Sequence, residues 1–85
     1  MLQIADEAVE ALRQTGALRI SARTVDGEVE LALEDADGPA AGDETVERDG
    51  ARVYLDAAAA EALADQVLGA HAHGDHVHFT FDDQD

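Results

Sequence analysis

The histidines of this chain are gathered in one short segment, and the Gly74-Asp75 pair at its centre is typical of a two-residue hairpin turn. Such a turn places His73 opposite His76. Two residues further from the turn, His71 lies opposite His78. Because side chains alternate along a strand, all four imidazoles would project from one side of the hairpin. Directly opposed Cβ atoms lie about 4.5–5.5 Å apart, so two imidazole nitrogens can share one metal ion.

The candidate metal ligands are therefore His71, His73, His76 and His78. Imidazole suits zinc, copper, nickel or iron rather than magnesium, and we expect zinc or nickel here. Asp75 and Asp82 could add oxygen ligands or accept hydrogen bonds from the imidazoles. Two other interpretations stay open. The face could be a solvated strand that is rich in histidine without a physiological metal, or a pH-responsive patch, since imidazoles titrate near pH ~6.5.

No other set of residues in the sequence suggests catalysis. The chain has no cysteine, which excludes disulfides, thiol nucleophiles and thiolate-ligated metals. Its only serine, Ser21, lies on a predicted strand with no partner that would activate it. Gly38 and Gly42 lie in an acidic loop that would repel phosphate. We therefore expect that the protein is not an enzyme.

The charge of the chain narrows the choice of partners. Twenty acidic residues against five basic ones, all arginine, give a formal net charge of −15. This excess repels phosphate, so nucleic acid and anionic membranes are poor candidates. It is typical of a soluble protein or of a salt-adapted or GC-rich genome, and the alternative is a basic protein partner. Without an apolar stretch of about 18 residues or a signal sequence, we expect a cytoplasmic location.

One hairpin is predicted with particular clarity. Apolar and polar residues alternate over 18–23 and 29–33, on either side of the turn pair Asp26-Gly27. That turn gives the cross-strand pairs Ile20–Leu33, Ala22–Leu31, Arg19–Glu34 and Arg23–Glu30. Apolar residues meet apolar residues and cations meet anions, as a correct register requires.

The remaining segments are predicted in the same way. A first helix is expected between Asp6, a candidate N-cap, and Gly16, with Ala8, Val9 and Leu12 inward. Residues 35–43 form an acidic loop. A second Asp-Gly turn at 49–50 would pair Val46 with Val53 and Glu47 with Arg52. Asp56 would cap a second helix whose inner stripe is Ala60, Leu63 and Ala64.

These segments predict an α+β fold in the order β-α-β-β-β-β-α-β-β, with antiparallel hairpins packed against two short helices. We expect a single domain over 1–85, in which 82–85 is a solvated acidic tail. Val77, Phe79 and Phe81 would face inward from the last strand. Much of the apolar content is alanine, so the core should be thin, one layer of helix on sheet, and a homodimer would bury more surface.

Several stretches carry a resemblance to a known family. They are a helix ending before Leu18-Arg19-Ile20, Gly42-Asp43 leading into a strand, the segment 50–56 before a short helix, and a closing hairpin with Phe79 and Phe81. Taken together, from Leu2 to Phe81, this layout resembles the HesB/IscA family of A-type iron–sulphur carriers. The resemblance implies a HesB/IscA-like fold and a role around iron–sulphur cluster assembly.

The same resemblance also defines what this chain lacks. Cluster-carrying members of the family use one cysteine in the first hairpin, near Thr24–Gly27 here, and a Cys-Gly-Cys pair beyond Phe81. No cysteine stands at either place. Iron–sulphur clusters need soft thiolate ligands, so we expect no cluster. The prediction is a non-catalytic protein that is accessory to cluster assembly, through protein contacts or loose metal handling. Its expected partner is another protein or a second copy of the chain. The alternative is a metal-binding or metal-buffering protein that uses the histidine hairpin.

Overall fold

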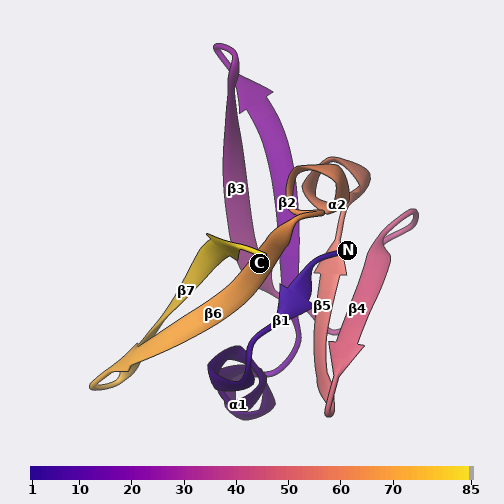
Figure 1. The fold of residues 1–85 in the computed structure, drawn as a ribbon. Coiled ribbons are helices and arrows are strands. Elements are labelled where there is room, and N and C mark those ends of the chain that lie inside the picture. The colour runs from indigo at the N-terminus through magenta and orange to yellow at the C-terminus, as the bar shows by residue number, and fades with distance from the viewer. Residues whose placement is uncertain (85) are drawn as a thin grey trace.

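The computed structural model describes residues 1–84, which form two helices and seven strands. In chain order these are β1 (Gln3–Ile4), α1 (Asp6–Thr15), β2 (Leu18–Val25), β3 (Glu28–Asp35), β4 (Glu44–Arg48), β5 (Ala51–Leu55), α2 (Ala57–Ala62), β6 (Gln66–His73) and β7 (His76–Asp83). The element order and the α+β class are therefore as predicted. Figure 1 shows the two longest hairpins, β2–β3 and β6–β7, projecting in different directions.

The strands form two sheets rather than the single layer expected from the thin core. One sheet has the order β1-β6-β7 and the other the order β3-β2-β5-β4. Hairpins account for three of the strand pairings, and two parallel pairings complete the sheets. Gln3 pairs with Val67 between β1 and β6, and Leu18 pairs with Val53 between β2 and β5. The parallel pairings join segments that are far apart in the sequence, and no local pattern predicted them.

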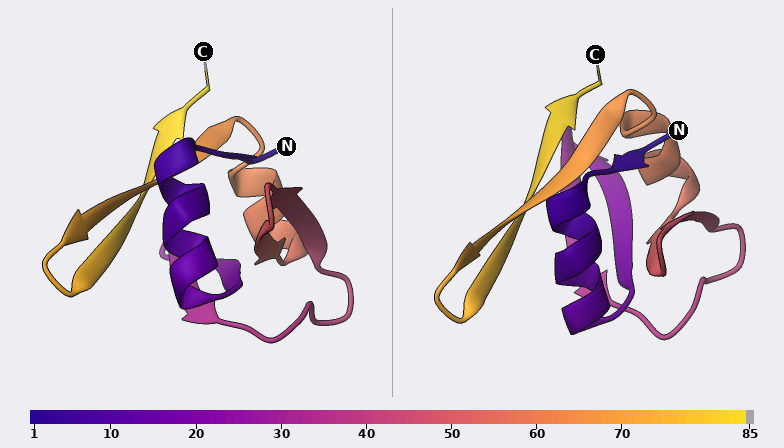
Figure 2. Two further views of the ribbon diagram at one scale, coloured as in Figure 1. Left: turned by 90° about the horizontal axis from the view of Figure 1, so that it is seen from below. Right: turned by 60° about the horizontal axis from the view of Figure 1, so that its bottom comes forward.

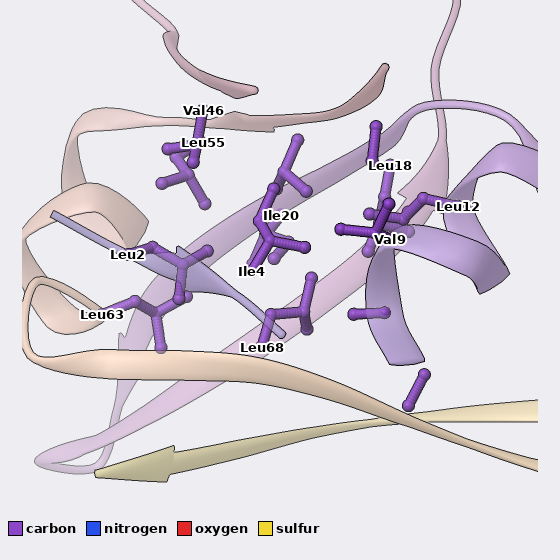
Figure 3. Close-up of a cluster of buried hydrophobic side chains, with 14 of the residues drawn as sticks. Leu2, Ile4, Val9, Leu12, Leu18, Ile20, Val46, Leu55, Leu63 and Leu68 are labelled. Carbon is purple, nitrogen blue, oxygen red and sulfur yellow. The ribbon is translucent and has the colours of Figure 1, made fainter. Parts of the chain in front are cut away.

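The core lies between these sheets and α1, and Leu2 and Ile4 of the first residues lie at its centre (Figure 3). Its largest fully buried side chains are Leu2, Ile20, Leu55, Leu68 and Val53. Figure 3 shows Leu2 and Ile4 between Leu68 on one side and Leu55 and Ile20 on the other. Helix α1 closes one end with Ala8, Val9 and Leu12, the inward face predicted for it. The two-layered core thus fixes the roots of both long hairpins.

The three predicted hairpin turns are all present. Asp26, Gly27, Asp49 and Gly50 have positive φ angles, which a type I′ turn requires at both central positions. Gly74 has φ of 60°, as the first central position of a type II′ turn requires. The predicted registers are confirmed, with Ile20 paired to Leu33 in the first hairpin and Val46 to Val53 in the second.

Two details of the helices differ from prediction. The N-cap of α1 is Ala5, which makes no side-chain cap, and Asp6 lies in the first turn instead. Asp56 caps α2 as expected, because its carboxylate accepts the amide hydrogen of Ala59. The buried residues of this helix and its end are Ala59 and Leu63, whereas Ala60 and Ala64 are only partly buried. The inner stripe thus begins one residue earlier than predicted.

The predicted acidic tail is partly wrong. Strand β7 continues to Asp83, and Gln84 is held by the start of the chain. The side-chain amide nitrogen of Gln84, Nε2, donates to the Met1 carbonyl oxygen at 2.8 Å and to the Gln66 carbonyl oxygen at 2.9 Å. Hydrogen bonds to backbone carbonyls thus fix the position of Gln84. The acidic composition of residues 82–85 could not predict these hydrogen bonds. Asp85 lies outside the described residues.

Candidate functional site

The histidine hairpin, residues 71–78, has the predicted register. His71 pairs with His78 and His73 with His76 across β6 and β7, and all four side chains are exposed on one face. The opposite face is apolar: Val77, Phe79 and Phe81 pack partly buried against the core. Figure 2 shows the tip of this hairpin standing away from α1, while its base passes beside the helix. The structure therefore presents the four imidazoles to solvent on a strand pair anchored by its other side.

The four histidines form two cross-strand pairs, which lie two residues apart along each strand of the hairpin. Within residues 1–84, no three histidine, aspartate or glutamate side chains converge in an arrangement able to hold one ion. Asp75 lies in the exposed turn, and Asp82 lies on the histidine face near the base of the hairpin. The structure thus brings together the predicted side chains on one face, and metal binding by them stays a prediction.

Gly69 marks a further feature of this face, next to the His71–His78 pair. A Cβ atom at Gly69 would lie 2.8 Å from Thr80 Oγ1, 3.4 Å from Glu7 Oε1 and 3.9 Å from Asp82 Oδ2. A side chain at this position would collide with Thr80 Oγ1, so the close approach of Thr80 favours glycine here. Sequence reasoning missed Glu7, which arrives from α1. The available signal was the glycine inside a strand, which often marks a close approach of another group.

A second surface lies on the β2–β3 hairpin. Val29 is 56% exposed and Leu33 37%, unusual values for large apolar side chains in this chain. A groove beside Val29 runs between the hairpin and α2, lined by Ala22, Thr24, Ala58 and Ala62 among others. The hairpin extends past α2 in Figure 1, so this apolar face continues beyond the core.

Strand β3 carries this apolar face along the end of its sheet. It is the terminal strand in the order β3-β2-β5-β4, so one of its edges has no neighbouring strand in that sheet. On the face opposite Val29, the strand presents Glu28, Glu30 and Glu34. Among residues 1–84, the hairpin thus combines an apolar face, an edge with no neighbouring strand in its sheet, and a charged face on which Glu30 and Glu34 pair with Arg23 and Arg19.

Most of the basic side chains are already engaged. Arg19, Arg23, Arg48 and Arg52 each form an ion pair with a carboxylate. Hydrogen bonds from Arg19 and from the Ala40 amide lower the pKa of the Asp43 carboxyl below its usual value, against a smaller opposing effect of burial. Since acids outnumber arginines four to one, the surface as a whole remains strongly acidic.

Comparison with known proteins places the fold. No family model matches the sequence, and no curated protein matches it. Several solved structures, however, match its fold. The crystal structure of IscA with the [2Fe–2S] cluster matches with a TM-score of 0.75 and 21% identity, over 98% of this chain and 85% of that chain. The chain has a HesB/IscA-like fold.

Two further structures agree with this assignment. Escherichia coli SufA, described as involved in the biosynthesis of iron–sulphur clusters, has a TM-score of 0.81 and 18% identity over 96% of this chain and 79% of SufA. A protein from Aquifex aeolicus, solved in solution by NMR, has a TM-score of 0.71 and 20% identity over 96% of this chain and 90% of that one. At these identities the likeness concerns the fold.

The donor atoms of this HesB/IscA-like chain do not suit an iron–sulphur cluster. The segment in which the family resemblance implies a cysteine, 24–27, is the tip of the β2–β3 hairpin. Its side chains offer the Thr24 hydroxyl and the Asp26 carboxylate, which are hard oxygen donors. Clusters are held by soft thiolates, and the sequence contains none.

Within residues 1–84, neither helix has the length and apolar composition that a membrane crossing needs.

Proposed function

We propose that this protein is a non-catalytic, HesB/IscA-like accessory of iron–sulphur cluster assembly, which acts by binding a basic protein partner and does not hold a cluster. The fold supports a place in that process, since SufA is described as taking part in cluster biosynthesis. The lack of cysteine supports a role other than cluster ligation. The single observation that carries the proposal is the exposed apolar face of the β2–β3 hairpin.

That face has the composition of a binding surface. Val29 and Leu33 lie on one side of β3. Val29 lines the groove that the hairpin forms with α2. Exposed apolar side chains that are grouped and bordered by charged residues are typical of protein–protein contact sites. Here the charged border is formed by Arg23 and Glu61, which line the groove beside Val29, whereas Glu28, Glu30 and Glu34 lie on the opposite face of β3.

The geometry favours a partner that adds a strand. A free sheet edge can accept an extended segment through backbone hydrogen bonds, while alternate side chains give specificity. Basic side chains of such a segment would meet the charged face of β3, where Glu28 makes no ion pair within residues 1–84, and its apolar side chains would cover Val29. A second copy of this chain fits less well, because acidic edge strands oppose self-pairing and a net charge of −15 adds repulsion.

The test uses purified cluster-assembly proteins of the same organism and measures their binding by titration calorimetry. Binding should be lost in Val29→Asp/Leu33→Asp and should weaken as salt concentration rises. The matched control is Val25→Asp, since Val25 is 38% exposed on the same hairpin but pairs with Glu28 on the other face. Equal affinity in both variants, binding to none of these proteins, or a homodimer dissociated by Val29→Asp would each overturn the proposal.

A further inference from the structure

A narrow groove lies between α1 and the β6–β7 hairpin, and it shares no residue with the groove beside Val29. It has a volume of about 270 Å³ and is lined by Glu7, Glu10, Ala11 and Gln14 of α1 and by Ala70, Ala72 and Val77 of the hairpin. We infer that this groove binds the side chain of one lysine or arginine from a basic protein segment. The inference rests on the basic partner proposed above, and it gives that partner a second contact point at a separate place on the fold.

The size of the groove limits what can enter it. Sites for drug-sized ligands have volumes of about 300–1,000 Å³, and this groove is smaller. Figure 2 shows the base of the hairpin passing beside α1 and the tip diverging from it, so the two elements are not packed together along their whole length. A helix or a strand needs more room, whereas one extended side chain fits.

The floor of the groove is apolar and consists of small side chains. Ala11 and Val77 pack partly buried against the core, and Ala70 is buried. A larger side chain in place of Ala72 would fill the groove. Lysine and arginine can lay their methylene stems along such an apolar surface while the charged end stays in water.

The rim of the groove carries negative charge. Glu7, Glu10 and Gln14 are separated by three and four residues, so their side chains follow one face of α1. Both glutamates are exposed, and among residues 1–84 neither takes part in an ion pair. Arg13, the nearest basic residue along the helix, lines two other cavities and not this groove. A cation that enters the groove would therefore meet two carboxylates.

The hairpin adds backbone acceptors on the same side. Strand β1 pairs with β6 only at Val67 and Leu68, so in the described part of the chain the edge of β6 beyond Leu68 has no neighbouring strand. The Leu68 carbonyl accepts the Ala5 amide at that edge. Because the backbone of a strand alternates with a period of two, the carbonyls of Ala70 and Ala72 are directed to the same edge. An ammonium or a guanidinium carries only donors, and these carbonyls are acceptors for them.

A second copy of this chain is a poor source of that cation. The sequence contains no lysine, and four of its five arginines form ion pairs within the chain. The net charge of −15 also opposes self-association and attracts a basic protein. The occupant is therefore a side chain of a different, basic partner.

The test uses n-butylguanidinium and n-butylammonium chloride as probes and follows the backbone amide signals of the full chain by two-dimensional NMR. The signals of Ala11, Ala72 and Val77 should shift and saturate, and the tighter of the two probes identifies the side chain as arginine or lysine. Guanidinium without a stem should bind about tenfold more weakly, because no methylene groups are buried. Pentanoate has the same butyl stem with the opposite charge and should not shift these signals.

Two variants change the groove itself. Ala72→Leu should abolish the shifts, since the larger side chain occupies the groove. Glu7→Gln/Glu10→Gln should weaken probe binding about fivefold. The matched control, Asp37→Asn/Glu44→Gln, removes two exposed carboxylates elsewhere and should change the affinity by no more than about twofold. The NMR spectrum of each variant also shows whether it is folded.

The groove and the β2–β3 surface can be tested separately. Val29→Asp/Leu33→Asp, which should lose the protein partner, should still bind the probe as wild type does. No saturable shift with either probe, equal shifts with pentanoate, or unchanged affinity in Ala72→Leu or in the glutamate variant would each overturn the inference.

Discussion

Arg19 and Asp43 form a two-point ion pair that joins β2 to the end of the acidic loop. Arg19 Nε lies 2.9 Å from Asp43 Oδ2, and Nη2 lies 3.0 Å from Oδ1. The Asp43 side chain is only 1% exposed, and it also accepts a hydrogen bond from the Ala40 amide. The Asp43 carboxylate thus bonds to both the loop and β2. Because both of its oxygens accept hydrogen bonds from one guanidinium, the pair has a defined geometry.

This pair predicts a pH dependence of stability. The folded state lowers the pKa of Asp43, so the contribution of the pair is complete above the usual carboxyl pKa of about 3.9 and is lost as pH falls through the lower, folded-state value. Asp43→Asn should therefore lower the melting temperature at neutral pH, and its difference from wild type should narrow below about pH 4. Thermal unfolding followed by circular dichroism, at neutral pH and below about pH 4, measures the melting temperatures of the variant and the wild type.

The control for this prediction is Asp37→Asn, which removes the same charge from an exposed position in the same loop. Its melting temperature should stay near that of wild type, or rise slightly because the net charge falls. A difference between Asp43→Asn and wild type that stays constant down to strongly acidic pH would contradict the role of the ion pair.

Much of the fold could be predicted because its signals are local. Each Asp-Gly pair fixes a turn, and the turn fixes the register of the two strands beside it, as with Ile20 and Leu33. The parallel pairing of β1 with β6 could not be predicted in this way. Strand β1 has two residues, too few for a periodic pattern, and its partner lies near the other end of the chain.

The candidate sites divide along the same line. The face shared by His71 and His78 follows from the turn at Gly74, so the sequence predicted it. Glu7 reaches that face only because α1 packs across β6, which no local pattern contains. The exposure of Val29 could not be predicted either. Alternation predicts which side chains share a face of the hairpin, but not how far along the hairpin the core extends.

Gln84 provides a test of how the chain ends are joined. Gln84→Ala removes a side chain that donates to the carbonyls of Met1 and Gln66 and is partly buried. Loss of these hydrogen bonds should lower the free energy of unfolding by about 1–2 kcal/mol. The control is Gln14→Ala, which changes an exposed glutamine on α1 and should alter the free energy of unfolding by less than about 0.5 kcal/mol. Urea denaturation measures both, and equal values would show that Gln84 does not join the chain ends.

The core predicts a large difference between two apolar positions on the same hairpin. Ile20 is fully buried between the sheets, so Ile20→Ala should lower the free energy of unfolding by about 2–5 kcal/mol. Val29→Ala should stay within about 0.5 kcal/mol of wild type, since Val29 is 56% exposed. Comparable losses at the two positions in urea denaturation would mean that the hairpin packs along its whole length.

Turn chemistry predicts a contrast between two glycines. Gly27 has φ of 83° and open space around its Cα, so Gly27→Ala should destabilise the fold by about 1–2 kcal/mol through backbone strain alone. Gly38 has equally open surroundings without a positive φ, and Gly38→Ala should be neutral or slightly stabilising. Melting temperatures compare the two variants. A larger loss at Gly38 than at Gly27 would be inconsistent with the turn assigned at Asp26-Gly27.

The absence of thiols predicts the outcome of cluster reconstitution. After anaerobic incubation with iron and sulphide, followed by desalting, the protein should show no visible absorbance from a [2Fe–2S] cluster. The physical reason is that bridging sulphide and ferric iron need soft terminal ligands, whereas this chain offers imidazole and carboxylate groups. IscA, treated in parallel, serves as the positive control. A stable cluster would contradict the proposed function, because it would show that nitrogen and oxygen ligands suffice on this fold.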